Sequence, residues 1–184
     1  MSDLFDTLVE GLIGREGGYA NNPADPGGET MWGVTRAVAR ENGYSGSMIA
    51  MTRDQAKAIY RTKYWAKPGL YLVAPLSAKL AEELLDTGVN MGTGTAGIFL
   101  QRALNTLNRR GKDYADITVD GGIGPGTARA LAAFLKVRGP VGETVMLKAL
   151  NCLQGARYID LAEDREASED FEFGWLANRV SIAA

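Results

Sequence analysis

Apolar residues near the start of the chain recur at helical spacing. Two adjacent i, i+4 rows cover the first turns: Leu4, Leu8 and Leu12, and beside them Phe5, Val9 and Ile13. This pattern predicts a helix with one wide apolar face, which Gly17-Gly18 would stop. At about 100° per residue Glu16 falls near the middle of that face. We therefore expect the Glu16 carboxyl group at the C-terminal end of a helix, turned toward the interior.

The rest of the chain is also mostly helical in pattern. Thr35 is placed to cap a short helix, and Thr52 with Gln55 forms a capping box for a helix to about Lys67. The periodicity predicts about six or seven helices in all, and no strand beyond a small hairpin near residues 20–35. We expect a break at residues 93–97, before a helix over 96–107, and Thr127 as the cap of a later helix.

Residues 16–35 interrupt the helical pattern. They contain five glycines, two prolines and three carboxylates, together with Tyr19 and Trp32. A long glycine-rich segment is usually either disordered or functional, and the two aromatic residues argue against disorder. The segment is therefore the candidate active site.

Burial and the partial negative charge of a helix C-terminus would both raise the pKa of Glu16. A raised pKa suits a carboxylic acid that donates a proton near neutral pH. The alternative is an ordinary glutamate on the last helical turn that reaches solvent. The residue pattern alone leaves both interpretations open.

The composition excludes several kinds of chemistry. The chain has 184 residues, which suits one domain or two small ones, and its net charge of −2 argues against a nucleic-acid partner. It has no histidine, and its single cysteine is Cys152. Ser-His-Asp and Cys-His catalysis are thereby excluded, along with nearly every zinc site, so we expect no metal and no cofactor. Paired carboxylates point first to glycoside hydrolysis.

The N-terminus has no basic region ahead of an apolar run, so we expect no signal peptide. No apolar stretch approaches the ~18 residues that span a membrane, and we expect no stable membrane insertion. The sequence therefore predicts a protein that is cytoplasmic on synthesis. We place a boundary between a lobe of residues 1–92 and a helical lobe of residues 93–184 packed on it.

Two polar surfaces have both a plain and a functional interpretation. Basic residues line the outer side of the helix after Thr52, and these either face solvent or contact an anionic polymer: Arg53, Lys57, Arg61, Lys63 and Lys67. Asp86 and Asn90 lie one turn apart on a polar helix face. They either line a substrate cleft or remain exposed to solvent.

Several motifs resemble a known family. Three recur in order at close spacing: Glu16-Gly-Gly-Tyr19, Asp25-Pro-Gly-Gly-Glu-Thr30 and Gly33-Val-Thr35. They resemble glycoside hydrolase family 108, the phage and bacterial N-acetylmuramidases with a lysozyme-like α (α+β) fold. Three later motifs resemble the peptidoglycan-binding module that accompanies it: Leu100-Gln-Arg-Ala-Leu-Asn105, Asp120-Gly-x-x-Gly-Pro-x-Thr127 and Phe171-x-x-Gly-Trp175-x-x-x-Arg179.

The resemblance implies roles for individual residues. Glu16 would be the general acid, while Asp25 and Thr30 would orient water or stabilise the sugar cation. The spacing from Asp25 to Thr30 is one residue shorter than in phage-type lysozymes, and Glu29 is an alternative second carboxylate.

Tyr19 and Trp32 would stack on sugars or pin the loop to the core. Retaining and inverting mechanisms both remain open. A retaining mechanism requires roughly 5–5.5 Å between the two carboxyl groups, and an inverting mechanism roughly 6.5–9.5 Å.

The implied activity is hydrolysis of the β-1,4 bond between N-acetylmuramic acid and N-acetylglucosamine, as in a bacteriolytic phage endolysin. The alternatives are a lytic transglycosylase and a non-catalytic cell-wall-binding protein. We expect a monomer whose partner is the peptidoglycan glycan strand. A holin or a secretion system would carry it to the periplasm and cell wall.

Overall fold

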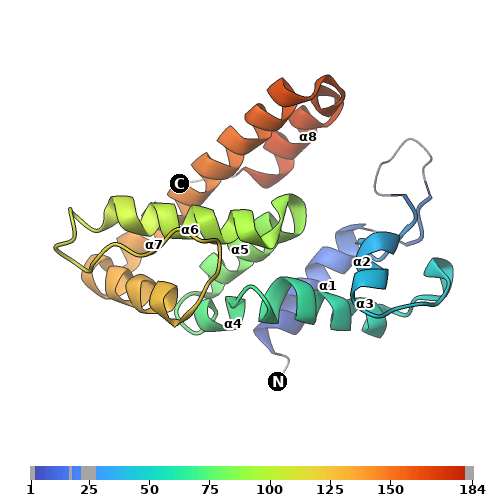
Figure 1. The fold of residues 1–184 in the computed structure, drawn as a ribbon, viewed down its shortest axis with the longest axis horizontal. Helices are drawn as coiled ribbons and strands as arrows, with labels where there is room; N and C mark the ends of the chain where they lie inside the picture. The colour runs from blue at the N-terminus through green and yellow to red at the C-terminus, as the bar shows by residue number, and fades with distance from the viewer. Residues whose placement is uncertain (1–2, 17, 22–27, 181–184) are drawn as a thin grey trace. The chain divides into compact units, whose positions relative to one another are not determined.

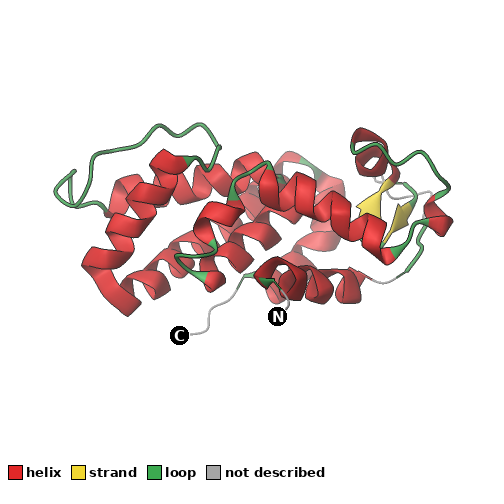
Figure 2. Cartoon of the chain, turned by 90° about the horizontal axis from the view of Figure 1, so that it is seen from below, coloured by secondary structure: helices red, strands yellow, loops and turns green. Residues whose placement is uncertain are grey.

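The structure is a computed structural model, and it describes residues 3–16, 18–21 and 28–180. Over this part of the chain it contains eight α-helices and one small antiparallel hairpin (Figures 1 and 2). The predicted fold class, mostly α with at most a hairpin near 20–35, is confirmed. Contacts divide the chain into two compact units, Met1–Leu70 and Tyr71–Ala184. The boundary at residue 92 stays a prediction.

The first unit contains these elements in order: α1 (Leu4–Glu16), β1 (Thr30–Met31), β2 (Val34–Thr35), α2 (Arg36–Glu41), the 3-10 turn η1 (Met48–Ala50), α3 (Arg53–Tyr60) and the π-helical turns η2 (Arg61–Ala66). The predicted caps are present. The backbone N–H of Val38 donates to the Thr35 hydroxyl, and Thr52 and Gln55 form the reciprocal capping box. These caps fix where α2 and α3 begin.

The core of the first unit forms where α1 packs on α3. The predicted apolar face of α1 is buried at Phe5, Val9, Leu12 and Ile13. The ring of Trp65 meets Phe5 edge-on, with 5.5 Å between the ring centroids. Since this face is buried along its length and α1 ends at Glu16, the predicted helix and its end are confirmed.

The second unit is helical throughout its described residues. Its elements are α5 (Ala78–Met91), α6 (Thr93–Leu107), α7 (Pro125–Asp164), the 3-10 turn η3 (Glu166–Ser168) and α8 (Glu169–Arg179), while α4 (Leu70–Val73) spans the division between the units. α5 packs on α6 and α7, and α8 packs on α7. No helix in the described residues is long and apolar enough to span a membrane.

Two predicted boundaries in this unit were wrong. The break predicted at residues 93–97 is confined to Gly92, whose φ of 92° is accessible to glycine, and α6 begins directly at Thr93. Gly124, not Thr127, is the N-cap of α7, because Pro125 occupies the first helical turn. α7 itself is two helices joined at a kink, where Gly139 has a φ of 60° and Pro140 follows.

The motif from Asp120 to Thr127 is a structural loop held by Gln101 of α6. The Gln101 side-chain amide donates to Asp120 Oδ1 at 2.8 Å and to the Gly122 carbonyl at 2.9 Å. Its carbonyl accepts from the backbone N–H groups of Asp120 and Gly121. Gly97 permits the close approach, because a Cβ there would lie 2.0 Å from the Gly121 carbonyl oxygen. The loop therefore positions α7 against α6.

Candidate active site

The candidate site in the first unit is built on the hairpin of β1 and β2. Thr30 pairs with Thr35 and Met31 with Val34, so Trp32 and Gly33 form a two-residue turn. Both turn residues have positive φ, 54° for Trp32 and 74° for Gly33. That conformation matches the twist of a hairpin but is uncommon for a non-glycine residue. The hairpin thus places a strained aromatic residue at its tip.

Ala20 extends the hairpin by a third segment. Its N–H donates to the Thr30 carbonyl at 2.9 Å, and the Thr30 N–H donates to the Ala20 carbonyl at 2.8 Å. This bridge lies between the end of α1 and the hairpin in sequence. Tyr19, the residue before Ala20, therefore lies beside the strand that carries Thr30.

Glu29 is the anchor of this arrangement. One carboxylate oxygen accepts a hydrogen bond of 2.7 Å from the Tyr19 hydroxyl, and the other pairs with the Arg36 guanidinium. The Glu29 side chain is only 12% exposed. The Arg36 N–H also donates to the Glu29 carbonyl at 2.8 Å. Since both carboxylate oxygens have partners, Glu29 is engaged in holding the loop, which weakens its case as a catalytic base.

Trp32 holds the hairpin to the following segment. Its indole N–H donates to the Met51 carbonyl at 2.9 Å, and the Arg53 guanidinium lies 5.7 Å from the ring centroid. Tyr19, by contrast, is 40% exposed. The contacts of Trp32 are those of a residue that pins the hairpin to the following segment, and its ring is half-buried. The Thr30 hydroxyl donates to the Gly28 carbonyl at 3.3 Å.

Glu16 and Asp25 are the two principal catalytic candidates. Glu16 is the last residue of α1, and its side chain lies outside the described part of the structure. Asp25 also lies outside the described residues. The structure therefore gives the positions of Tyr19, Glu29, Thr30 and Trp32, and the assignment of Glu16 and Asp25 stays a prediction.

The basic side of α3 is largely neutralised by carboxylates of its own unit. Arg53 and Lys57 pair with Glu10, and Arg61 pairs with Asp3 and Asp6 at 3.0 Å each. The hydrogen bond from Lys57 and the charge of Arg53 lower the pKa of Glu10. Because these cations have intramolecular partners, a general affinity for anionic polymers is not favoured.

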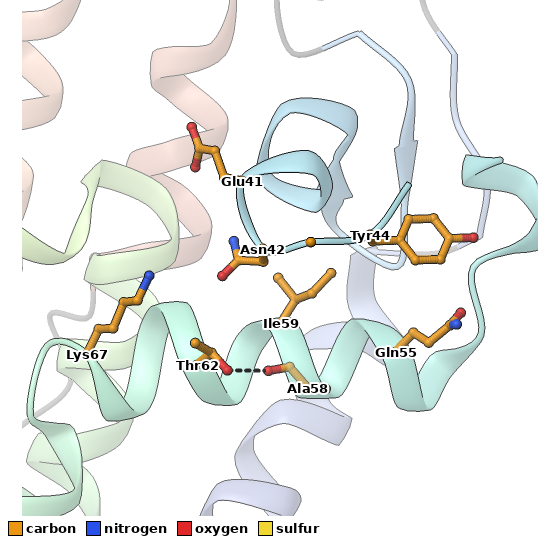
Figure 3. Close-up of a pocket in the computed structure, with 9 residues that line it drawn as sticks. Glu41, Asn42, Tyr44, Gln55, Ala58, Ile59, Thr62 and Lys67 are labelled. Carbon is orange, nitrogen blue, oxygen red and sulfur yellow. Dashed lines mark hydrogen bonds between the residues drawn. The ribbon is translucent and has the colours of Figure 1, made fainter. Parts of the chain in front are cut away.

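A groove that the sequence did not reveal runs along the same helix (Figure 3). It has a volume of about 490 Å³ and lies between the end of α2 and the α3–η2 helix. Its lining includes Glu41, Asn42 and Tyr44 on one side and Gln55, Ile59, Thr62 and Lys67 on the other. The sequence feature that could have indicated the groove was the Asn42-Gly43 helix stop, followed by a helix with polar residues such as Gln55 and Thr62.

Asp86 and Asn90 belong to the second unit, where they have intramolecular partners. The Asn90 side-chain amide donates to the Asp86 carbonyl at 2.8 Å and to its carboxylate at 3.1 Å. Arg179 of α8 also donates to the Asp86 carboxylate, at 3.2 Å. Asp86 therefore ties α8 to α5, and its role in substrate binding stays a prediction.

Glu83 is a half-buried carboxyl group that sequence reasoning missed. Burial, and then the charge of Asp86, raise its pKa to about 7. Among the described residues, one of its oxygens has no hydrogen-bond partner, and neither the Gln154 amide nor the Tyr158 hydroxyl makes a well-formed hydrogen bond. The sequence signal for its apolar surroundings was its position three residues after Leu80 and one before Leu84, both of which are buried.

Two family matches and one solved structure relate the chain to known proteins. Residues 9–92 match Glycosyl hydrolase 108, and residues 95–180 match a family described as a predicted peptidoglycan domain. The fold is similar to that of SagA from Brucella abortus, with a TM-score of 0.69 and 25% sequence identity over 94% of this chain and 87% of that one. No curated protein matches the sequence.

The glycosyl hydrolase match includes the second half of α1 and the whole hairpin, and it implies a glycoside hydrolase. More specifically, the chain carries a glycosyl hydrolase 108 domain followed by a predicted peptidoglycan-binding domain, which confirms the resemblance inferred from the motifs.

Proposed function

We propose that the protein is an N-acetylmuramidase that hydrolyses the β-1,4 bond between N-acetylmuramic acid and N-acetylglucosamine in peptidoglycan. In this proposal Glu16 is the general acid and Asp25 the second carboxylate. The second domain contributes affinity for the same polymer. The biological role we propose is lytic, as in a phage endolysin.

One observation carries the proposal. α1 is buried along one face at Phe5, Val9 and Ile13, and the helix ends at Glu16. The helical period of the sequence predicts that Glu16 falls on the same face. The partial negative charge at a helix C-terminus disfavours the ionised form of a carboxyl group and so raises its pKa. A general acid near neutral pH requires such a raised pKa. The hairpin follows directly along the chain with the remaining candidates.

The contacts of Glu29 favour Asp25 as the second carboxylate. Glu29 accepts from Tyr19 and pairs with Arg36, so its removal would loosen the hairpin. Asp25 and Thr30 would then orient the attacking water or stabilise the sugar cation. We expect Glu29 to position the loop through Tyr19 and Arg36 without touching the reacting atoms.

The test compares Glu16→Gln, Asp25→Asn and Glu29→Gln on purified sacculi, with the melting temperature of each variant measured in parallel. We expect Glu16→Gln to abolish hydrolysis while the protein remains folded. Asp25→Asn should reduce activity more than Glu29→Gln, and only Glu29→Gln should lower the melting temperature. Product masses identify the reaction, because hydrolysis adds water, about 18 mass units, to the cleaved strand.

Three results would contradict the proposal. Retention of more than a few per cent of activity by Glu16→Gln would remove Glu16 from the acid role. An anhydro-sugar product would identify a lytic transglycosylase. Binding of wild-type protein to sacculi without any cleavage would identify a non-catalytic cell-wall-binding protein.

A further inference from the structure

The groove beside α3 combines an apolar floor with polar groups on both sides. Ile59 is 5% exposed and forms the floor, as Figure 3 shows. The Asn42 side-chain N–H group donates to the Val38 carbonyl. The side-chain carbonyl oxygen of Asn42 faces the groove and can accept a hydrogen bond from a ligand. Gln55 uses its carbonyl oxygen in the capping box, which leaves its N–H groups as donors. The groove thus offers both a donor and an acceptor of amide type.

Lys67 differs from the other cations of this helix. Arg53, Lys57, Arg61 and Lys63 each pair with a carboxylate. Among the described residues no carboxylate pairs with the ammonium group of Lys67, the residue that follows η2, and this side chain extends toward Asn42 (Figure 3). An unpaired ammonium group at the end of a groove favours an anionic ligand group such as a carboxylate.

The dimensions of the groove suit a short peptide. Gln55 and Lys67 are separated by 12 positions along α3 and η2, which corresponds to at most roughly 18 Å, because the π-helical η2 rises less per residue than an α-helix. A peptide of about four or five extended residues spans roughly 13–18 Å. An extended peptide presents backbone N–H and C=O groups that match the amides of Asn42 and Gln55, and its terminal carboxylate would reach Lys67.

The groove begins beside the candidate active site. Gln55 completes the capping box with Thr52, and the preceding residue, Met51, accepts the hydrogen bond from Trp32 at the hairpin tip. η1 also contacts β1. The side branches of a polymer bound at the hairpin would therefore lie close to the Gln55 end of the groove.

We propose that this groove binds the peptide stems attached to the glycan strand of peptidoglycan, with Lys67 holding a stem carboxylate. This inference rests on the proposed function, because it assigns a second contact with the same substrate. Asn42 and Gln55 pair with the peptide backbone, and Ile59 contacts an apolar side chain such as that of alanine. The groove would favour strands that carry free stems.

The experiment uses two substrates made from one preparation: glycan strands with intact stems, and the same strands stripped of peptides by an amidase. Lys67→Gln should raise KM on the stem-bearing strands about three- to tenfold, with kcat unchanged. It should leave KM on the stripped strands at the wild-type value. The matched control is Lys57→Gln, which removes the same charge from the same helix at a site outside the groove, and it should leave both KM values at those of the wild type.

A second measurement keeps the inference separate from the catalytic proposal. Free stem tetrapeptide is titrated into the isotopically labelled full chain, and the amide signals of Asn42, Gly43 and Thr62 are followed by NMR. Selective shifts of these signals that disappear in Lys67→Gln support the groove even if the enzyme cleaves neither substrate. Absence of such shifts at millimolar peptide, or an equal rise in KM on stripped strands, would overturn the inference.

Discussion

The Glu83 carboxyl group should make the stability of the second unit depend on pH. It lies on α5 against α7, and the groups around it are Glu82 and Asp86 of α5 and Asn151 of α7. Its pKa is raised from 4.5 to about 7, first by burial and then by the charge of Asp86, against a lowering by the Asn151 amide. Glu83→Gln replaces it with a neutral side chain of nearly the same shape.

The sign of the effect follows from proton binding. Above pH 4.5 the unfolded chain has released the Glu83 proton, while the folded chain keeps it up to about pH 7. The folded state therefore binds more protons in this range, and its free energy of unfolding decreases as the pH rises from about 4.5 to about 7. The shift corresponds to about 3 kcal/mol at ~1.36 kcal/mol per unit, and partial exposure to solvent reduces our expectation to about 1–2 kcal/mol.

Urea denaturation of wild type and Glu83→Gln at pH 5 and pH 8 measures this contribution. From pH 5 to pH 8 the free energy of unfolding of Glu83→Gln, relative to that of wild type, should increase by about 1–2 kcal/mol. Glu82→Gln is the matched control, because Glu82 is exposed on the same helix and its substitution should have a similar effect at both. A pH-independent difference between Glu83→Gln and wild type would refute the reasoning.

Two further predictions concern the loop held by α6. Gly97→Ala should destabilise the chain by about 2–3 kcal/mol, because its Cβ would lie 2.0 Å from the Gly121 carbonyl oxygen. Gly94→Ala, which meets nothing within 4 Å, should stabilise it by up to ~1 kcal/mol, and a lower melting temperature for Gly94→Ala would contradict this. Gln101→Leu should cost about 2–4 kcal/mol, because the N–H groups of Asp120 and Gly121 lose their acceptor, and hydrogen exchange at these two amides should accelerate.

Local sequence determined the elements and the family. The apolar rows of α1 and the caps at Thr35 and Thr52 depend on neighbours within a few residues, so periodicity and capping rules predicted them. The motif around Glu16 and Thr30 likewise identified the glycosyl hydrolase 108 domain. The break predicted at residues 93–97 was wrong because Gly92 alone, with its positive φ, separates α5 from α6.

Tertiary structure decided which polar residues are engaged. Nothing local distinguishes Lys67 from Lys57, and only packing shows that Lys57 meets Glu10 while Lys67 faces a groove. Packing likewise gives Glu29 its partners Tyr19 and Arg36, and it half-buries Glu83 of α5 against α7. These partners lie from seven to more than forty positions away in sequence, beyond the reach of capping and periodicity rules. The pKa or availability of a charged group depends on burial and on neighbours within a few ångströms, which only the folded chain defines.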